Sequence, residues 1–166
     1  MPIRLPEIAG GSCYFCRILE DANERWRVIE ETPLTVTVLN GRQFEVGQCI
    51  VVPVRHAPTL LDLADEEGGA VFAAARRAAQ AMVAAFDPEG VLLYQNNGVG
   101  SGQEVPHFHL HVVPRQAGSE WGLGPPHIAR LEQRPPHLDH TIVTDAKRAA
   151  AETLRLGMSA GATRMP

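Results

Sequence analysis

The chain predicts an α+β fold, with an antiparallel sheet of about five strands, one long helix and a short N-terminal helix. Two observations lead to this prediction. Short segments rich in β-branched and other apolar residues are joined mostly by turns, which is typical of antiparallel strands. One long stretch, residues 65–86, instead repeats apolar residues every three or four positions, which is typical of an amphipathic helix.

The strand segments are bounded by turn signals such as Asn40-Gly41 or by prolines such as Pro114. The second of them, residues 34–39, alternates β-branched and apolar residues, and the third is a continuous apolar run typical of a central strand. The expected strands are residues 26–30, 34–39, 49–54, 91–95 and 105–113.

The long helix begins at Asp65, where three consecutive acidic residues favour a helix N-terminus, and it ends at Asp87-Pro88. Its apolar stripe is expected to face the core and comprises Phe72, Ala75, Ala79, Met82, Val83 and Phe86. A short helical segment is expected over residues 13–19, and a closing helix over residues 144–156.

A length of 166 residues is consistent with a single domain that can bury an ordinary core. Residues 1–11 contain two prolines and two glycines and are expected to form a flexible leader. The domain proper is expected over residues 12–123. Residues 124–166 form a proline-rich tail that ends in the closing helix.

Composition excludes several classes of partner. The net charge of −4 argues against duplex nucleic acid, because surfaces that follow phosphates are basic. No apolar run approaches the roughly 20 residues that a membrane span needs. Three cysteines without an export signal indicate a reducing compartment, so we expect a cytoplasmic protein.

The most informative motif is the run Pro106-His107-Phe108-His109-Leu110-His111-Val112-Val113-Pro114. On a strand, its three histidines share one face while the intervening apolar residues take the other. Three imidazoles in a row pack poorly, because each ring carries a donor and an acceptor that need partners when buried. The motif therefore indicates a site that handles phosphate or metal.

A row of histidines on a strand can serve three purposes. Metal binding in the cupin manner would need a carboxylate a few residues later, but the next acidic residue after His111 is Glu120, and the metallo-hydrolase pattern His-x-His-x-Asp-His fails at His111 and Val112. Nucleophilic catalysis at phosphorus suits a neutral imidazole, and the glycine-rich loop over residues 96–103 can present backbone N–H groups to an anion. The third use is a row of surface histidines on an exposed strand. Phosphoryl chemistry fits the surroundings best.

The run from His107 to Val113 resembles the histidine triad (HIT) family motif. The resemblance covers residues 12–123 and includes Cys13-Tyr14-Phe15-Cys16, Val52-Pro53-Val54-Arg55-His56, Asn96-Asn97-Gly98 and Gly102-Gln103-Glu104-Val105-Pro106. It implies an HIT-like fold and a homodimeric nucleotide hydrolase or transferase, similar to microbial members with an N-terminal Cys-x-x-Cys. Members cleave phosphoanhydride or phosphoramidate bonds at a nucleoside α-phosphate.

The resemblance also implies roles for four histidines. His109 matches the nucleophile, whose other ring nitrogen is held by a backbone carbonyl in the family. His111 would contact the phosphate and the bridging oxygen. His107 and His56 would support the nucleophile from behind.

The nucleotide contacts follow in the same way. Asn40 matches the position that holds the ribose hydroxyls, and Asn97 and Gln103 would contact the phosphate or the leaving group. Glu104 departs from the family pattern, which often has Ser or Thr there to assist the leaving group. A carboxylate would repel an anionic leaving group, so either Glu104 turns away or the preferred leaving group differs.

Cys13 and Cys16 form half of a tetrahedral zinc site. Microbial relatives with this pair complete the site with the residues that match His56 and His107. A structural zinc is therefore expected, against the alternative of a plain reduced cysteine pair, and no organic cofactor is implied.

The leading hypothesis is a hydrolase that acts on an adenine nucleotide through a nucleotidyl intermediate on His109. The alternative is a nucleotide-binding regulatory or interaction module with little turnover, which Glu104 and the unmatched tail favour. Dinucleoside polyphosphates and nucleoside phosphoramidates both remain open as substrates, and Asn40 favours the polyphosphates slightly.

Overall fold

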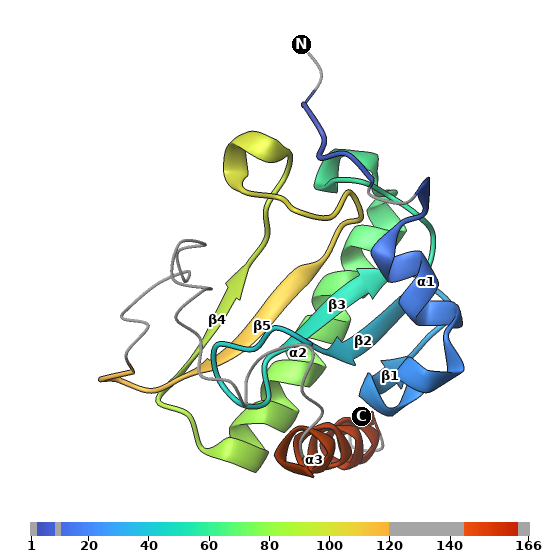
Figure 1. The fold of residues 1–166 in the computed structure, drawn as a ribbon. Helices are drawn as coiled ribbons and strands as arrows, with labels where there is room; N and C mark the ends of the chain where they lie inside the picture. The colour runs from blue at the N-terminus through green and yellow to red at the C-terminus, as the bar shows by residue number, and fades with distance from the viewer. Residues whose placement is uncertain (1–2, 9–10, 120–144, 163–166) are drawn as a thin grey trace.

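The computed structural model describes residues 3–8, 11–119 and 145–162, and its centre is a five-stranded sheet (Figure 1). The strand order is β1-β2-β3-β5-β4, and every neighbouring pair is antiparallel. The α+β fold expected from the sequence is confirmed. The strands are β1 (Val28–Glu31), β2 (Thr35–Leu39), β3 (Cys49–Pro53), β4 (Gly90–Tyr94) and β5 (Leu110–Arg115).

The helices surround this sheet, and none of those in the described ranges is long and apolar enough to cross a membrane. The proline-rich part of the tail, residues 124–144, lies outside the described residues. The α-helices are α1 (Tyr14–Glu20), α2 (Asp65–Phe86) and α3 (Asp145–Ala162), and the 3-10 helices are η2 (Ala22–Arg27), η3 (Leu60–Asp62) and η4 (Val99–Ser101).

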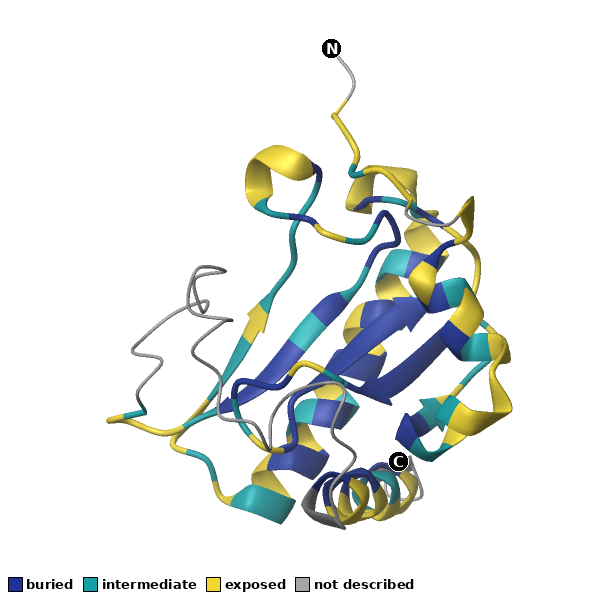
Figure 2. Ribbon diagram, in the orientation of Figure 1, coloured by how far each residue is buried: buried dark blue, intermediate teal, exposed yellow. Residues whose placement is uncertain are grey.

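The two faces of the sheet pack against different helices. Helix α2 crosses behind the sheet in Figure 1, with α3 beside it, and α1 lies in front. Alternate strand residues such as Val51 and Val112 join the core beneath α2 and α3, whereas Ile50 and Val52 join a smaller cluster with α1. In Figure 2, β2 and β3 are buried along their whole length, while β4 is largely half-buried or exposed.

The buried stripe of α2 differs from the expected one. Met82 is buried and Phe86 packs partly against the core, but Phe72 is 59% exposed and Val83 is 49% exposed. Alanine side chains on the buried face let α2 approach the sheet and α3 closely. Phe72 and Val83, which each follow a buried residue by one position, therefore point towards solvent. The buried apolar residues of α2 are Val71, Ala74, Ala75, Ala78, Ala81 and Met82.

The first turn of α2 is held by a buried carboxylate. Glu67 accepts the backbone N–H of Ala64 at 2.9 Å, and its two oxygens accept from the Arg55 guanidinium at 2.8 and 2.6 Å. These donors, Arg55 first, lower the pKa of Glu67 to about 2. The pair joins the segment after β3 to the start of α2.

The histidine strand begins later than expected, so the prediction of a strand over residues 105–113 is wrong at its N-terminal end. Pro106 cannot donate to a ladder, and the N–H of Phe108 bonds to Ala57 O at 2.6 Å in the segment after β3. Only His111 of the three histidines lies within β5. The alternation nevertheless persists, because Phe108, Leu110 and Val112 all join the core beneath α2.

Candidate active site

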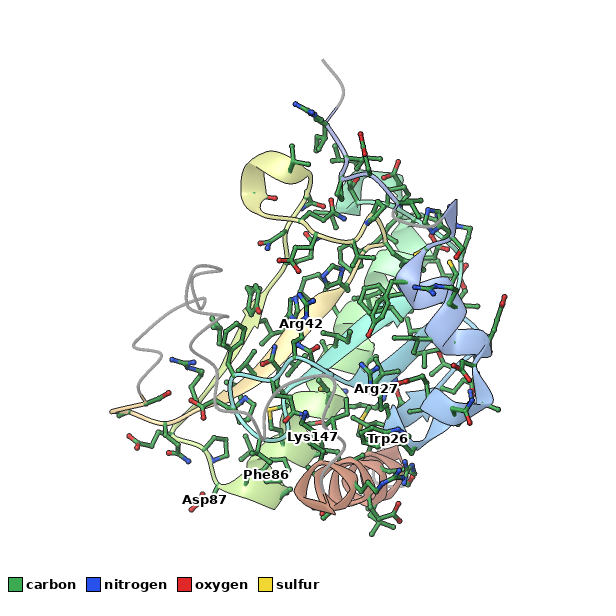
Figure 3. The ribbon with its side chains drawn as sticks, in the orientation of Figure 1. Trp26, Arg27, Arg42, Phe86, Asp87 and Lys147 are labelled. Carbon is green, nitrogen blue, oxygen red and sulfur yellow. The ribbon has the colours of Figure 1, made fainter. Side chains whose placement is uncertain are left out.

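A cavity of about 450 Å³ lies on the α1 face of the sheet. In Figure 3 the side chain of Arg42 lies in front of the sheet, with α2 behind it. His109 and His111 line the cavity together with residues of α1, of the loop after β2 and of the segment before His107. The main lining residues are Cys13, Phe15, Asn40, Arg42, Ile50, Tyr94, Asn96, Glu104, His109 and His111.

The hydrogen bonding of His109 fixes its tautomer. Its Nδ1 lies 2.7 Å from the carbonyl oxygen of His107, and a carbonyl can only accept, so Nδ1 carries the proton. The lone pair therefore sits on Nε2. The ring packs against Phe15, with centroids 4.9 Å apart, and burial lowers the pKa of His109. A neutral imidazole with an available lone pair is a competent nucleophile.

His111 is oriented by two neighbours. Its ring stacks on Tyr94 with centroids 4.3 Å apart and planes 11° apart. Its Nδ1 lies 3.4 Å from the Gln48 side-chain nitrogen, which donates, so the proton of the neutral ring is on Nε2. Burial, and then the nearby His109, lowers the pKa of His111. The ring can thus donate one N–H bond to a phosphate oxygen.

Four side chains from distant parts of the sequence meet behind His109. The potential ligand atoms of Cys13, Cys16, His56 and His107 all lie within 4.8 Å of one another. Nδ1 of His107 is 3.4 Å from Sγ of Cys13 and 3.6 Å from Sγ of Cys16, and Nδ1 of His56 is 3.5 Å from Sγ of Cys16. The structure thus brings together the four residues that the sequence pointed to as metal ligands.

The environment of His107 fits a metal ligand. Its Nε2 donates to Pro53 O at 3.0 Å, so the lone pair on Nδ1 faces the two sulfurs. Burial lowers the pKa of His107 to about 4, which keeps the imidazole neutral. Burial and then Cys13 raise the pKa of the Cys16 thiol to about 11. A bound dication would stabilise the thiolate and so lower this pKa. Two thiols and two imidazoles are a donor set that zinc accepts.

Glu104 has a partner that sequence reasoning missed. Its Oε2 accepts from Nη1 of Arg42 at 3.1 Å, and both side chains are about half exposed, at 50% and 49%. Asn40 holds the loop that carries Arg42, because its Oδ1 accepts the Arg42 backbone N–H at 3.1 Å. All three line the cavity. The side chain of Glu104 therefore neither points away nor stands unpaired.

Asn97 and Gln103 have engaged side chains. Asn97 accepts from Leu60 N at 2.7 Å, and the buried Gln103 accepts from Gly98 N at 2.6 Å and donates to Pro58 O at 2.7 Å. Neither is among the described residues that line the cavity, where their neighbours Asn96 and Gly102 appear instead. Both amides shape the loop rather than face the cavity.

Sequence reasoning missed Arg42, Gln48 and Tyr94. Arg42 follows the Asn40-Gly41 turn by one residue, which placed it near the ribose position. Gln48 is a polar residue directly before an apolar strand, and Tyr94 pairs with His111 across β4 and β5. In the sheet, β5 lies between β3 and β4, and this order brings the ends of β2 and β3 and the residue Tyr94 near the histidines. The sequence left the strand order open.

Comparisons with known proteins agree with this geometry. The HIT domain family profile matches residues 22–118, which is more than half of the chain. An adenosine 5'-monophosphoramidase of Schizosaccharomyces pombe is 30% identical over 113 residues, covering 68% of this chain and 80% of that protein. An asymmetrical bis(5'-nucleosyl)-tetraphosphatase of the same organism is 31% identical over 90 residues, covering 54% of this chain and 50% of that protein.

A solved structure extends the agreement to nearly the whole chain. The crystal structure of a zinc-bound histidine triad family protein from Mycobacterium smegmatis has a TM-score of 0.72 at 25% identity, and the match covers 93% of this chain and 98% of that one. The expectation of a histidine triad hydrolase agrees with the names of these relatives. By its profile match, its fold and the positions of its histidines, the chain belongs to the HIT family.

Proposed function

We propose that the protein is a nucleotide hydrolase that cleaves at a nucleoside α-phosphate through His109. The observation that carries the proposal is the bond from Nδ1 of His109 to the His107 carbonyl, which leaves the Nε2 lone pair for attack in a cavity shared with His111. Nε2 attacks the α-phosphorus, the leaving group departs with its bonding electron pair, and water then cleaves the phosphorus–nitrogen bond.

The other roles follow from position. His111 donates from Nε2 to an oxygen of the phosphate as its charge develops, which is worth roughly 3–4 kcal/mol for a well-placed donor. His107 and His56 support the segment behind the nucleophile. Asn40, at the end of β2, is assigned to the ribose hydroxyls. Asn97 and Gln103 are assigned to phosphate recognition through the loop that they shape, with its backbone N–H groups as donors.

An adenine nucleotide is the substrate that we favour. The relatives named as an adenosine 5'-monophosphoramidase and a bis(5'-nucleosyl)-tetraphosphatase support phosphoramidate and phosphoanhydride substrates respectively. The second candidate function is a nucleotide-binding module with little turnover, which the engaged amides of Asn97 and Gln103 favour.

We also propose that Cys13, Cys16, His56 and His107 hold a structural zinc ion. The zinc-bound histidine triad relative supports this assignment. The ion would supply a cross-link between α1, the segment after β3 and the segment that leads to His109, and the chemistry would remain with His109 and His111. No organic cofactor is proposed.

We propose further that residues 12–123 form the catalytic unit and that the protein is a cytoplasmic homodimer. The three cysteines are all free, which suits a reducing compartment. Strand β4 is an edge of the described sheet and leaves Leu93 40% exposed, a surface that suits pairing with a second copy. Light scattering on the parent and on Leu93→Glu, which should shift the protein to monomer, tests the assembly.

The test of function compares the parent with His109→Ala on diadenosine tri- and tetraphosphate and on adenosine phosphoramidate. Release of AMP by the parent and not by the variant, with AMP binding retained by both, supports the hydrolase. The control is Glu31→Gln, on β1 outside the cavity lining, which should keep full turnover. Equal, negligible release from the parent and His109→Ala, with tight AMP binding, would favour the binding module.

A further inference from the structure

One ion pair spans the rim of the cavity beside the reactive histidines. Arg42 approaches from the loop after β2, and Glu104 from the segment that leads to His107. With both side chains about half exposed, the pair is solvated and therefore weak, so that a ligand can compete for either partner. A paired guanidinium is nevertheless a poorer phosphate site than an unpaired one.

The chain is held in place at Arg42 and next to Glu104. The Arg42 N–H is held by Asn40, the residue that we assign to the ribose. Glu104 follows Gln103, which is 4% exposed and bonds to Pro58 O and to Val105 O at 2.7 and 2.9 Å. The two charged groups therefore lie within reach of a substrate in the cavity, while their half-exposed side chains can still separate.

We propose that Arg42 and Glu104 act as a charge filter that selects substrates with a cationic amine leaving group over polyphosphates. This inference rests on the proposed function. A leaving polyphosphate would have to draw Arg42 away and would then face the unpaired Glu104 carboxylate, because like charges that meet repel. An ammonium group beside the scissile nitrogen is instead attracted to Glu104, and the pair need only loosen.

The reaction balances without a further reagent. Nε2 of His109 attacks the α-phosphorus, and the phosphorus–nitrogen bond of the substrate breaks with its electron pair going to the amine nitrogen, which takes a proton from solvent. Water then hydrolyses the nucleotidyl-histidine, giving the nucleoside monophosphate and the free imidazole. The filter thus reverses the slight preference for polyphosphates that Asn40 suggested from the sequence.

The experiment measures kcat/KM for two substrates and takes their ratio. One substrate is an adenosine phosphoramidate whose leaving amine also carries an ammonium group elsewhere in its side chain. The other is diadenosine tetraphosphate. For the parent we expect the cationic amide to be favoured by about tenfold or more. Glu104→Gln should lower the ratio by about tenfold, because Arg42 is released for phosphate, and Arg42→Gln should raise it.

The matched control is Glu31→Gln, which breaks an equally exposed ion pair with Arg25 outside the cavity lining and should leave the ratio unchanged. Added salt should bring the parent ratio closer to one, because both effects act through exposed charges. The filter alone would be overturned if turnover requires His109 but the kcat/KM ratio changes less than about twofold in both Glu104→Gln and Arg42→Gln. A change of the ratio in the same direction in both variants would overturn it as well. Absence of turnover in the parent would overturn the proposed function and the filter together.

Discussion

The side-chain amide of Gln48 is fixed between a backbone N–H and His111. The backbone N–H of Phe44 lies 2.8 Å from the amide oxygen Oε1. Because a backbone N–H can only donate, its partner must be this oxygen, and the amide nitrogen must therefore face Nδ1 of His111. Gln48 is fully buried, and this arrangement orients the ring as well as setting its tautomer. Under the proposed function, Gln48 is thus a positioning residue for His111, the proposed donor to the phosphate.

Gln48→Glu should lower kcat by about 10²-fold with a smaller change in KM, because one donor to the phosphate is lost. The carboxylate keeps the acceptor for Phe44 but draws the proton of His111 to Nδ1. Nitrogen chemical shifts of His111 report this tautomer directly, and a purely structural role for Gln48 would not move them.

Gln43→Glu is the matched control for this prediction. Gln43 is also fully buried in the same loop, and its Oε1 accepts from Gly47 N at 3.1 Å. Any cost in stability should therefore be similar, while kcat of the folded variant stays near that of the parent. Equal losses of kcat in the two variants would show that loop damage, rather than the tautomer, explains the effect.

Zinc should raise the melting temperature of the metal-free protein. Binding that favours the folded state by about 3 kcal/mol follows when free zinc is about 100 times its dissociation constant. Cys13→Ser should abolish the shift, because one of the four ligands is lost. Cys49→Ala serves as control, since Cys49 is buried in the sheet outside the cluster and its loss should lower stability yet preserve the zinc response.

Metal analysis of the purified protein gives the complementary readout. We expect about one zinc per chain in the parent and in Cys49→Ala, and little in Cys13→Ser. A parent protein that contains no zinc and whose melting temperature ignores added zinc would contradict the assignment.

Glu67→Gln should lower the free energy of unfolding by about 1–2 kcal/mol at pH 7. This figure is smaller than the pKa shift alone would give, because solvent screens the half-exposed Arg55. The pKa of Glu67 is about 2 when folded, below its ordinary value near 4.3. Its contribution is therefore complete above about pH 5 and is lost as the pH falls towards 2.

The measurement is urea unfolding of the parent and Glu67→Gln at pH 7, 4 and 3. The gap between them should shrink with acidity, and Glu66→Gln, exposed on the same turn, should show only a smaller loss of about 0.3–1 kcal/mol at pH 7. A gap that is constant or that widens in acid would refute the role given to this carboxylate.

Met82→Ala should cost about 2–5 kcal/mol, because Met82 is fully buried between α2 and the sheet. Phe72→Ala, on the same helix, should change the free energy of unfolding by less than about 0.5 kcal/mol, because its ring is mostly exposed. Chemical denaturation of both variants distinguishes the observed stripe from the one expected from the sequence, which would have made Phe72 the more damaging loss.

Local patterns predicted most of the fold. Alternation located the strands, and the acidic start at Asp65 and the break at Asp87-Pro88 gave both ends of α2. The stripe of α2 was harder, because alanines are weak apolar signals, and only close packing against α3 shows that they form the contact. Likewise, the start of β5 depends on the bond between Phe108 and Ala57, which joins segments about fifty residues apart.

The site shows the same division. His107, His109 and His111 were recognised because their chemistry is written in one short motif, and the cysteine pair pointed to the ligand cluster. Arg42 and Gln48 were missed because each acts through a partner more than sixty residues away, Glu104 in one case and His111 in the other. Pairings of this kind depend on strand order, which local patterns do not encode.

The N-terminal segment lies close to the cavity. The carbonyl of Arg4 accepts the N–H of Val99 at 2.9 Å, Ile3 fills the space where a Gly98 side chain would stand, and Glu7 and Ile8 line the cavity. An affinity tag fused ahead of these residues would therefore emerge beside the entrance to the cavity. Rate constants obtained with such a fusion would describe an altered entrance, so enzymology on this protein should begin with the tag removed.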